Sequence, residues 1–102
     1  MATARSGQIT VAATGTAVTG PDSGPGTFLL WANPANTGTL CYVGNDGADD
    51  VGSTTGYTLS KSIGNTVVLK VSNLNQWYFD ADTNGDKIQY IMIEGESLGP
   101  AL

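Results

Sequence analysis

The sequence contains no histidine among its 102 residues and only one cysteine, Cys41. The absence of histidine excludes Ser-His-Asp and Cys-His nucleophiles and most zinc and iron ligand sets, so we expect no enzyme, no catalytic residue and no cofactor. A single cysteine excludes an intrachain disulfide. Because nothing near Cys41 in sequence would lower its thiol pKa, we interpret it as a small buried hydrophobe.

Charged residues are also scarce. They make up 13% of the chain, against about 25% in an average globular domain. Four are basic and nine are acidic, for a formal net charge of −5. This balance argues against nucleic-acid binding, because clustered Lys and Arg supply most of that affinity. A small domain with so few charges favours a surface that is partly covered by a partner protein.

Long hydrophobic runs and helical spacing are both missing. No apolar run approaches the ~18 residues of a membrane span, and the first residues lack the apolar centre of a secretion signal. We therefore expect a protein that is made in a cytoplasm and does not bind a membrane. No stretch of ten or more residues has the spacing of a helix.

Short alternating segments separated by Gly, Pro, Asn and Asp are present instead. They predict an all-β fold, a single small β-sandwich or jelly-roll-like domain of seven or eight short antiparallel strands. We expect a flexible N-terminal arm at residues 1–7, the sandwich domain at residues 8–93 and a C-terminal tail at residues 94–102. The continuous apolar run Thr27 to Ala32, anchored by Trp31, indicates burial on both faces or burial of one face against a partner.

The stretch Trp77 to Ile93 has two interpretations. Its residues 80–86 (DADTNGD) match the opening of a calcium loop, but the twelfth position, which should be a bidentate Glu, is Ile91. Alternatively, Asn84-Gly85 is the two-residue turn of a β-hairpin in which Phe79 faces Tyr90. The hairpin register places the apolar residues on one face, so we favour it and expect no metal site.

Two other kinds of ligand site were weighed. Asp80 and Asp82 could be the carboxylate pair of a glycosidase, but a domain this small has little material for the required water-excluding cleft. We expect no small-molecule substrate. The aromatic residues could also form a sugar-stacking platform, which would consist of Tyr78 with Trp31 or Tyr57. We favour core packing or a protein interface for the aromatic residues.

Four segments, taken in order, resemble a known family. They are Ala32–Thr39 (ANPANTGT), Tyr42–Asn45 (YVGN), Gly56–Leu59 (GYTL) and Val71–Ala81 (VSNLNQWYFDA). Together they look like small all-β virion proteins of tailed bacteriophages, over most of residues 8–93. Similar sequences have a shorter Ala-Gly turn where this chain has Ser60 to Gly64, which leaves the register of the following strand open.

The resemblance implies a capsid decoration or cement protein on the capsid surface of the virion, made in the host cytoplasm. Such a protein binds the major capsid protein, bridges neighbouring subunits and is commonly a homotrimer. We expect the apolar run or the tail to form the trimer. A tail or baseplate accessory domain and a carbohydrate-binding adhesion domain remain alternatives. The expected partner-binding residues are Met1, Ala2, Thr3, Ala4 and Arg5 of the arm, with Trp31 and Tyr78.

Overall fold

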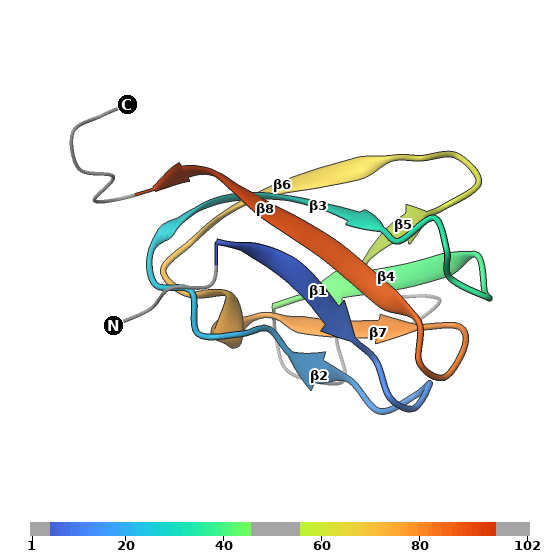
Figure 1. Ribbon diagram of the computed structural model, residues 1–102. Coiled ribbons are helices and arrows are strands. Elements are labelled where there is room, and N and C mark those ends of the chain that lie inside the picture. The colour runs from blue at the N-terminus through green and yellow to red at the C-terminus, as the bar shows by residue number, and fades with distance from the viewer. Residues whose placement is uncertain (1–4, 46–55, 96–102) are drawn as a thin grey trace.

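The computed structural model describes residues 5–45 and 56–95, which form two antiparallel four-stranded sheets packed face to face (Figure 1). This architecture confirms the expected all-β fold. Sheet A has the strand order β1-β8-β3-β6, and sheet B has the order β2-β7-β4-β5. Sheet A contains β1 (Ser6–Thr10), β8 (Lys87–Gly95), β3 (Gly26–Ala32) and β6 (Thr66–Val71). Sheet B contains β2 (Val18–Thr19), β7 (Tyr78–Ala81), β4 (Leu40–Gly44) and β5 (Tyr57–Ser60).

Each strand pairs with its counterpart counted from the other end of the chain: β1 with β8, β2 with β7, β3 with β6 and β4 with β5. The chain therefore resembles one long hairpin that is folded over so that successive pairs fall alternately in sheet A and sheet B. Two more pairings, β3 with β8 and β4 with β7, complete the sheets. This order is that of a jelly roll, which sequence analysis had left open against other sandwich topologies.

Inward-facing residues of both sheets form one hydrophobic core. Phe28 of β3 and Tyr90 of β8 meet edge to face there, with ring centroids 6.0 Å apart. Trp77 packs against the core as a partly buried residue. The other large side chains that are fully buried are Leu30, Phe79, Leu59, Leu74, Ile88 and Val11. Burial of these apolar side chains is the main driving force for folding.

Cys41 lies in the same core and is fully buried, which confirms that it is a buried hydrophobe. Burial raises its thiol pKa from 9.0 to about 12, and the nearby carboxylates of Asp86 and Asp82 add to the effect. A thiol with such a pKa is protonated at neutral pH, so Cys41 contributes packing rather than reactivity.

The expected hairpin within Trp77 to Ile93 does not form. β7 lies in sheet B and β8 in sheet A, so Phe79 pairs with Val43 of β4, and Tyr90 pairs with Leu30 of β3. The apolar faces of β7 and β8 contribute to the core from opposite sides. The prediction was wrong because alternation specifies which residues face the core, but not which strand is the hydrogen-bonded neighbour.

Asn84-Gly85 does form a turn, but of another type. The amide of Asp86 donates to the carbonyl of Thr83 at 3.2 Å, and Gly85 has φ of +84°, whereas Asn84 has a negative φ. A positive φ at the third turn residue alone is typical of a type II turn, while a type I′ turn requires it at both central residues. The turn carries the chain from sheet B to sheet A.

Sheet A extends beyond the boundaries expected for the sandwich. β1 begins at Ser6, so Ser6 and Gly7 belong to the sheet and not to the arm. The carbonyl of Arg5 accepts a hydrogen bond from the amide of Met92 at 2.6 Å, and β8 continues to Gly95. The other arm residues, Met1, Ala2, Thr3 and Ala4, and the tail after Gly95 lie outside the described residues.

Candidate interaction surface

The outer face of sheet A is apolar at its centre. On β3, Leu29 and Trp31 alternate with buried residues and therefore point away from the core. Leu29 pairs with Val68 of β6 on one side and with Ile91 of β8 on the other. Paired residues of antiparallel strands project to the same face, so the three aliphatic side chains form a row across adjacent strands. Val68 and Ile91 are 55% and 42% exposed.

A β-bulge adds Ile93 to this surface. Phe28 pairs with Met92, whereas the preceding residue, Thr27, pairs with Glu94, so Ile93 is the extra residue of β8. A bulge interrupts the alternation, and consecutive residues Ile93 and Glu94 are both exposed. We refer to the resulting surface as the sheet A strip, which consists of Leu29, Trp31, Val68, Ile91 and Ile93.

Trp31 lies at one end of the strip. Its indole nitrogen donates to Oε1 of Gln89 at 2.7 Å, so the polar edge of the ring is satisfied within the sheet. A hollow of about 330 Å³ adjoins it, lined by Leu29, Trp31, Pro34, Lys61 and the turn before β6. An apolar side chain of a partner could occupy this hollow against Trp31, as anchor residues do in protein interfaces.

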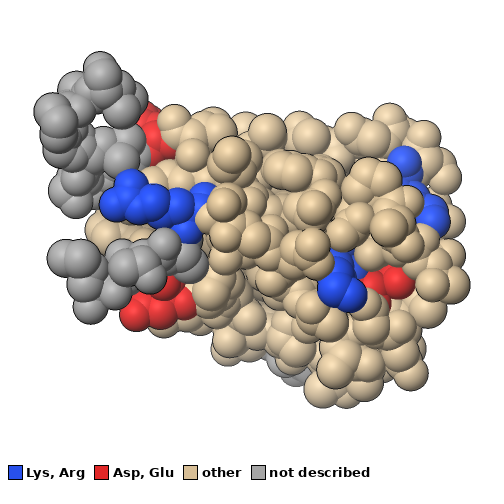
Figure 2. Space-filling model, in the orientation of Figure 1, with Lys and Arg blue, Asp and Glu red and all other residues tan. Residues whose placement is uncertain are grey.

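The basic residues of the chain gather around this face. Lys70 of β6 and Lys87 of β8 each neighbour a buried residue on their strand and so point outward, at opposite ends of the sheet. Lys61 lines the hollow beside Trp31, and Arg5 directly precedes β1. Figure 2, in the orientation in which β1 and β8 cross in front of sheet B, shows a broad uncharged middle between charged ends.

The acidic residues are distributed differently. Among the residues that the structure describes, Glu94 is the acidic residue of sheet A. Asp80 and Asp82 belong to β7 or follow it, Asp22 lies between β2 and β3, and Asp86 is buried before β8. Among the described residues, the four basic residues and Glu94 together carry +3, and Asp22, Asp80, Asp82 and Asp86 carry −4. The described basic residues thus lie in or next to sheet A.

The calcium-like motif contributes hydrogen bonds to the surrounding chain. Oδ1 of Asp80 accepts from the amide of Gly15 at 3.1 Å, and Oδ1 of Asp82 accepts from the hydroxyl of Tyr42 at 2.6 Å. Burial raises the pKa of Tyr42 to about 12, and the hydrogen bond to Asp82 adds to this effect. Within residues 5–45 and 56–95, no group of three or more Asp, Glu, Cys or His side chains could hold a metal ion.

The second half of the motif connects two other loops. Oδ1 of Asn84 accepts from the amide of Thr14 at 2.8 Å. The two carboxylate oxygens of Asp86 accept from the amides of Thr37 and Gly38, at 3.0 and 2.8 Å. The carboxylate and amide oxygens that resemble a metal-binding set are thus used to join loops at one end of the sandwich.

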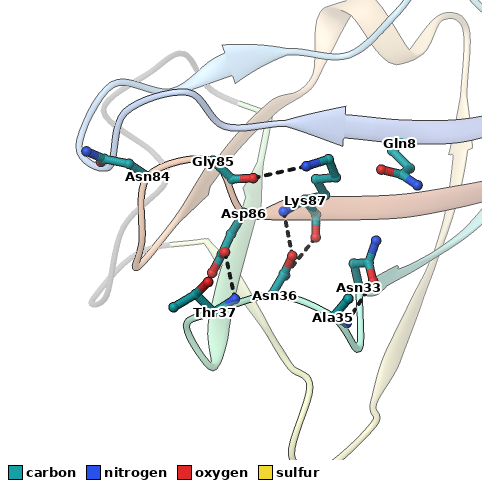
Figure 3. A pocket seen from close by; sticks show the side chains of 9 residues that line it. All are labelled: Gln8, Asn33, Ala35, Asn36, Thr37, Asn84, Gly85, Asp86 and Lys87. Atoms are coloured by element: carbon teal, nitrogen blue, oxygen red, sulfur yellow. Dashed lines mark hydrogen bonds between the residues drawn. The ribbon is translucent and has the colours of Figure 1, made fainter.

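A polar hollow of about 290 Å³ lies at this end, and Figure 3 shows the side chains around it. Asn36 lies in its wall and forms two hydrogen bonds with the backbone of Lys87, at 2.8 and 2.9 Å. Oδ1 of Asn33 accepts from the amide of Ala35 at 2.8 Å. Asn36 was not among the residues expected to form a site, and its segment was noted only as part of the resemblance at residues 32–39. The side chains of Asn33, Asn36 and Asp86 already form hydrogen bonds with nearby backbone groups. We therefore interpret the hollow as part of the hydrogen-bond network that joins the loops, and not as a ligand site.

The structure does not bring Trp31 and Tyr78 together. Trp31 is on the outer face of sheet A, whereas Tyr78 precedes the inward Phe79 on β7 and points outward from sheet B. Tyr57 shares a face of β5 with the buried Leu59, so it does not lie beside Tyr78 either. The sugar-stacking platform of Tyr78 with Trp31 or Tyr57, which sequence analysis considered, is therefore not formed.

Comparison with protein-family models, with curated proteins and with solved structures finds no match to this chain. None of the described residues belongs to a helix that is long and apolar enough to cross a membrane. The functional interpretation therefore depends on the residues and surfaces described above.

Proposed function

We propose that this chain is a structural virion protein, a capsid decoration or cement protein of a tailed bacteriophage. The observation that supports the proposal is the sheet A strip, an apolar surface across three adjacent strands of a small domain with few charges. A contiguous exposed apolar patch typically marks a contact with another protein. The ordered segments that resemble small all-β virion proteins, such as residues 32–39, indicate which kind of partner this is.

The proposed mechanism is structural. The domain binds the outer surface of the head and contacts the major capsid protein on both sides of a boundary between subunits. Because a bound domain must detach before those subunits separate, its binding free energy is added to the stability of the shell. Binding as a homotrimer would let one weak contact act several times. Native mass spectrometry tests the oligomer, and a protein that stays monomeric at micromolar concentration would contradict the trimer.

The described side chains favour this function over an enzymatic one. Cys41 is buried and has a raised pKa, so its thiol is a poor nucleophile at neutral pH. The carboxylates of Asp80 and Asp82 accept hydrogen bonds from separate groups, Gly15 and Tyr42, and neither residue lines one of the two hollows described above. These observations support a function in which the domain acts by burying surface against a partner.

Quantitative counting of this protein on purified phage particles tests the proposal. Hundreds of copies per particle are expected of a protein that decorates the shell. A handful of copies would instead indicate a tail or baseplate accessory domain, and the absence of the protein from particles would contradict any virion function. Particles from a phage that lacks the gene serve as the control for background protein.

A further inference from the structure

We infer that the sheet A strip is the surface that contacts the shell, and that its partner there is a protein surface with an apolar centre and acidic margins. The inference rests on the proposed function and identifies the partner of that same contact. The outward-facing side chains of the run Thr27 to Trp31 then contact the shell, although the sequence had suggested this run for the trimer contact. Three features of the domain indicate this partner.

Apolar and basic groups are combined on the outer face of sheet A. The row formed by Val68, Leu29 and Ile91 lies between Lys70 at one end of the sheet and Lys87 at the other. The two lysines are separated by about six residues along the strands, or roughly 20 Å at ~3.4 Å per residue. This exceeds the Debye length of about 8 Å, so each lysine interacts separately with its own acidic group. A complementary partner therefore carries carboxylates on both sides of an apolar patch.

Charge disfavours a face-to-face pair of two copies of this chain. Such a pair would match one strip with another, which is favourable for the apolar residues. It would also bring together two faces on each of which Lys61, Lys70, Lys87 and Glu94 sum to +2. Like charges that face each other across an interface oppose association, so the strip does not suit a second copy of itself.

The outer face of sheet B on a second copy of this chain is also a poor partner for the strip. Among the described residues, that side has the exposed carboxylate of Asp82, which would match a basic margin of sheet A. However, the exposed large hydrophobic residues of the described chain lie elsewhere. Val68, Ile91 and Ile93 are in sheet A, Ile63 is in the turn before β6, and Tyr57 lies on the core-facing side of the edge strand β5. The described outer face of sheet B thus carries none of these exposed hydrophobic side chains, so a different protein suits the strip better than a second copy does.

Co-sedimentation with expanded shells that lack this protein tests the inference. We expect Ile91→Asn and Val68→Asn each to weaken binding by at least about tenfold, because each places an amide in the centre of the apolar contact. Lys70→Gln and Lys87→Gln should weaken binding by about threefold at low salt, and this difference should disappear at high salt. Thermal melting checks that each variant is folded. The substitutions should be tolerated because these side chains point away from the core, and the two apolar variants test the contact independently.

Two matched controls lie off the strip. Ala12→Asn introduces an amide at an exposed position between β1 and β2, and Gln76→Glu lowers the net charge by one in the short 3₁₀ helix η2 (Leu74–Gln76). Both should bind shells like the unmodified protein. If the unmodified protein binds but Ile91→Asn and Val68→Asn bind equally well, the inference is wrong and the proposed function stands.

The remaining outcomes are also decisive. If the unmodified protein does not sediment with shells, the proposed function fails and the inference fails with it. If Ile91→Asn dissociates an oligomer in native mass spectrometry while shell binding is retained, the strip binds a second copy and the assigned partner is wrong. If Lys70→Gln and Lys87→Gln bind normally at low salt, the inference that the partner has acidic margins is wrong.

Discussion

The side-chain amide of Asn36 pairs with both backbone groups of Lys87. Its Oδ1 accepts from the Lys87 amide at 2.8 Å, and its Nδ2 donates to the Lys87 carbonyl at 2.9 Å. The Asn36 side chain is only 8% exposed. It lies beside β8 where the neighbouring strand β3 has ended after Ala32. The amide of Asn33 also donates to the Lys87 carbonyl, at 3.1 Å, so the Asn36 side chain is needed chiefly as the partner of the Lys87 amide.

Replacing Asn36 should destabilise the protein. In Asn36→Ala the buried amide of Lys87 loses its partner, and we expect the free energy of unfolding to fall by about 2 kcal/mol. Urea unfolding followed by tryptophan fluorescence measures this change. Asn33→Ala is the matched control, because Asn33 accepts one hydrogen bond within an exposed turn and should cost less than about 1 kcal/mol. Equal effects of the two substitutions would contradict this role of Asn36.

Gly38 should not tolerate a side chain. A Cβ at this position would lie 2.4 Å from Oγ1 of Thr83 and 2.9 Å from Oδ2 of Asp86. We expect Gly38→Ala to lower the free energy of unfolding by about 1–3 kcal/mol, the usual cost of overpacking. The double variant Gly38→Ala with Thr83→Ala should recover part of the loss. Additive effects in thermal melting would show that the two residues do not clash.

Stability should fall in alkaline solution. Burial raises the pKa of Tyr42 from 10.0 to about 12, and that of Cys41 from 9.0 to about 12. Because the folded state favours the neutral forms, the stability they contribute is complete below about pH 9 and is lost as the pH rises toward 12. Urea unfolding at pH 8 to 12 measures the loss.

The variant Tyr42→Phe separates the contribution of Tyr42 to the alkaline loss of stability from that of Cys41. It removes the hydrogen bond to Asp82 and should lower stability at neutral pH by about 1 kcal/mol. It should also make the decline between pH 10 and 12 shallower, because Tyr42 no longer ionises. An unchanged slope in this range would mean that Tyr42 does not contribute to the alkaline loss.

Calcium should not affect the stability of the fold. The side-chain oxygens of Asp80, Asp82, Asn84 and Asp86 already accept hydrogen bonds from other parts of the chain. We expect the melting temperature to be the same with a chelator and with millimolar calcium, since a ligand that binds the folded state would raise it. A shift of several degrees with calcium, absent with magnesium, would contradict this expectation.

The N-terminal arm should be shorter than the sequence suggested. Deletion of residues 1–4 should leave the melting temperature unchanged and weaken shell binding, as expected of an arm that contacts the capsid. Deletion of residues 1–7 should also destabilise the fold, because it removes the pairing of Ser6 with Ile91 and of Gly7 with Tyr90. Unchanged shell occupancy after the shorter deletion would exclude a role for the arm.

Much of the fold could be predicted from local patterns. The alternation in Thr66 to Val71 and the apolar run at residues 27–32 correspond to β6 and β3, and Cys41 is buried as expected. These features depend on period-two burial, which is written directly in the order of residues. The predicted hairpin, in which Phe79 faces Tyr90, was wrong. Alternation shows which residues face the core, but no local pattern shows which distant segments pair as strands.

The candidate surface was predicted in part. The unpatterned run that ends in Trp31 suggested a strand with an apolar second face, and the structure places that face outward. The association of Leu29 with Val68 and Ile91 depends on the register of three strands far apart in sequence. Tyr78 was grouped with Trp31 because alternation places Tyr78 on the polar face of its strand, but the two strands belong to different sheets.

The sequence by itself determined the all-β character, the low charge and the residues of the core, because each follows from composition or from alternation along a short segment. Tertiary structure alone decided that β7 and β8 lie in different sheets, that Asn36 completes the edge of Lys87, and that the basic residues gather around sheet A. These features depend on contacts between residues far apart in sequence, such as Asn36 with Lys87, which are 51 positions apart. Such contacts form only when long loops close and both sheets pack, so no local pattern specifies them.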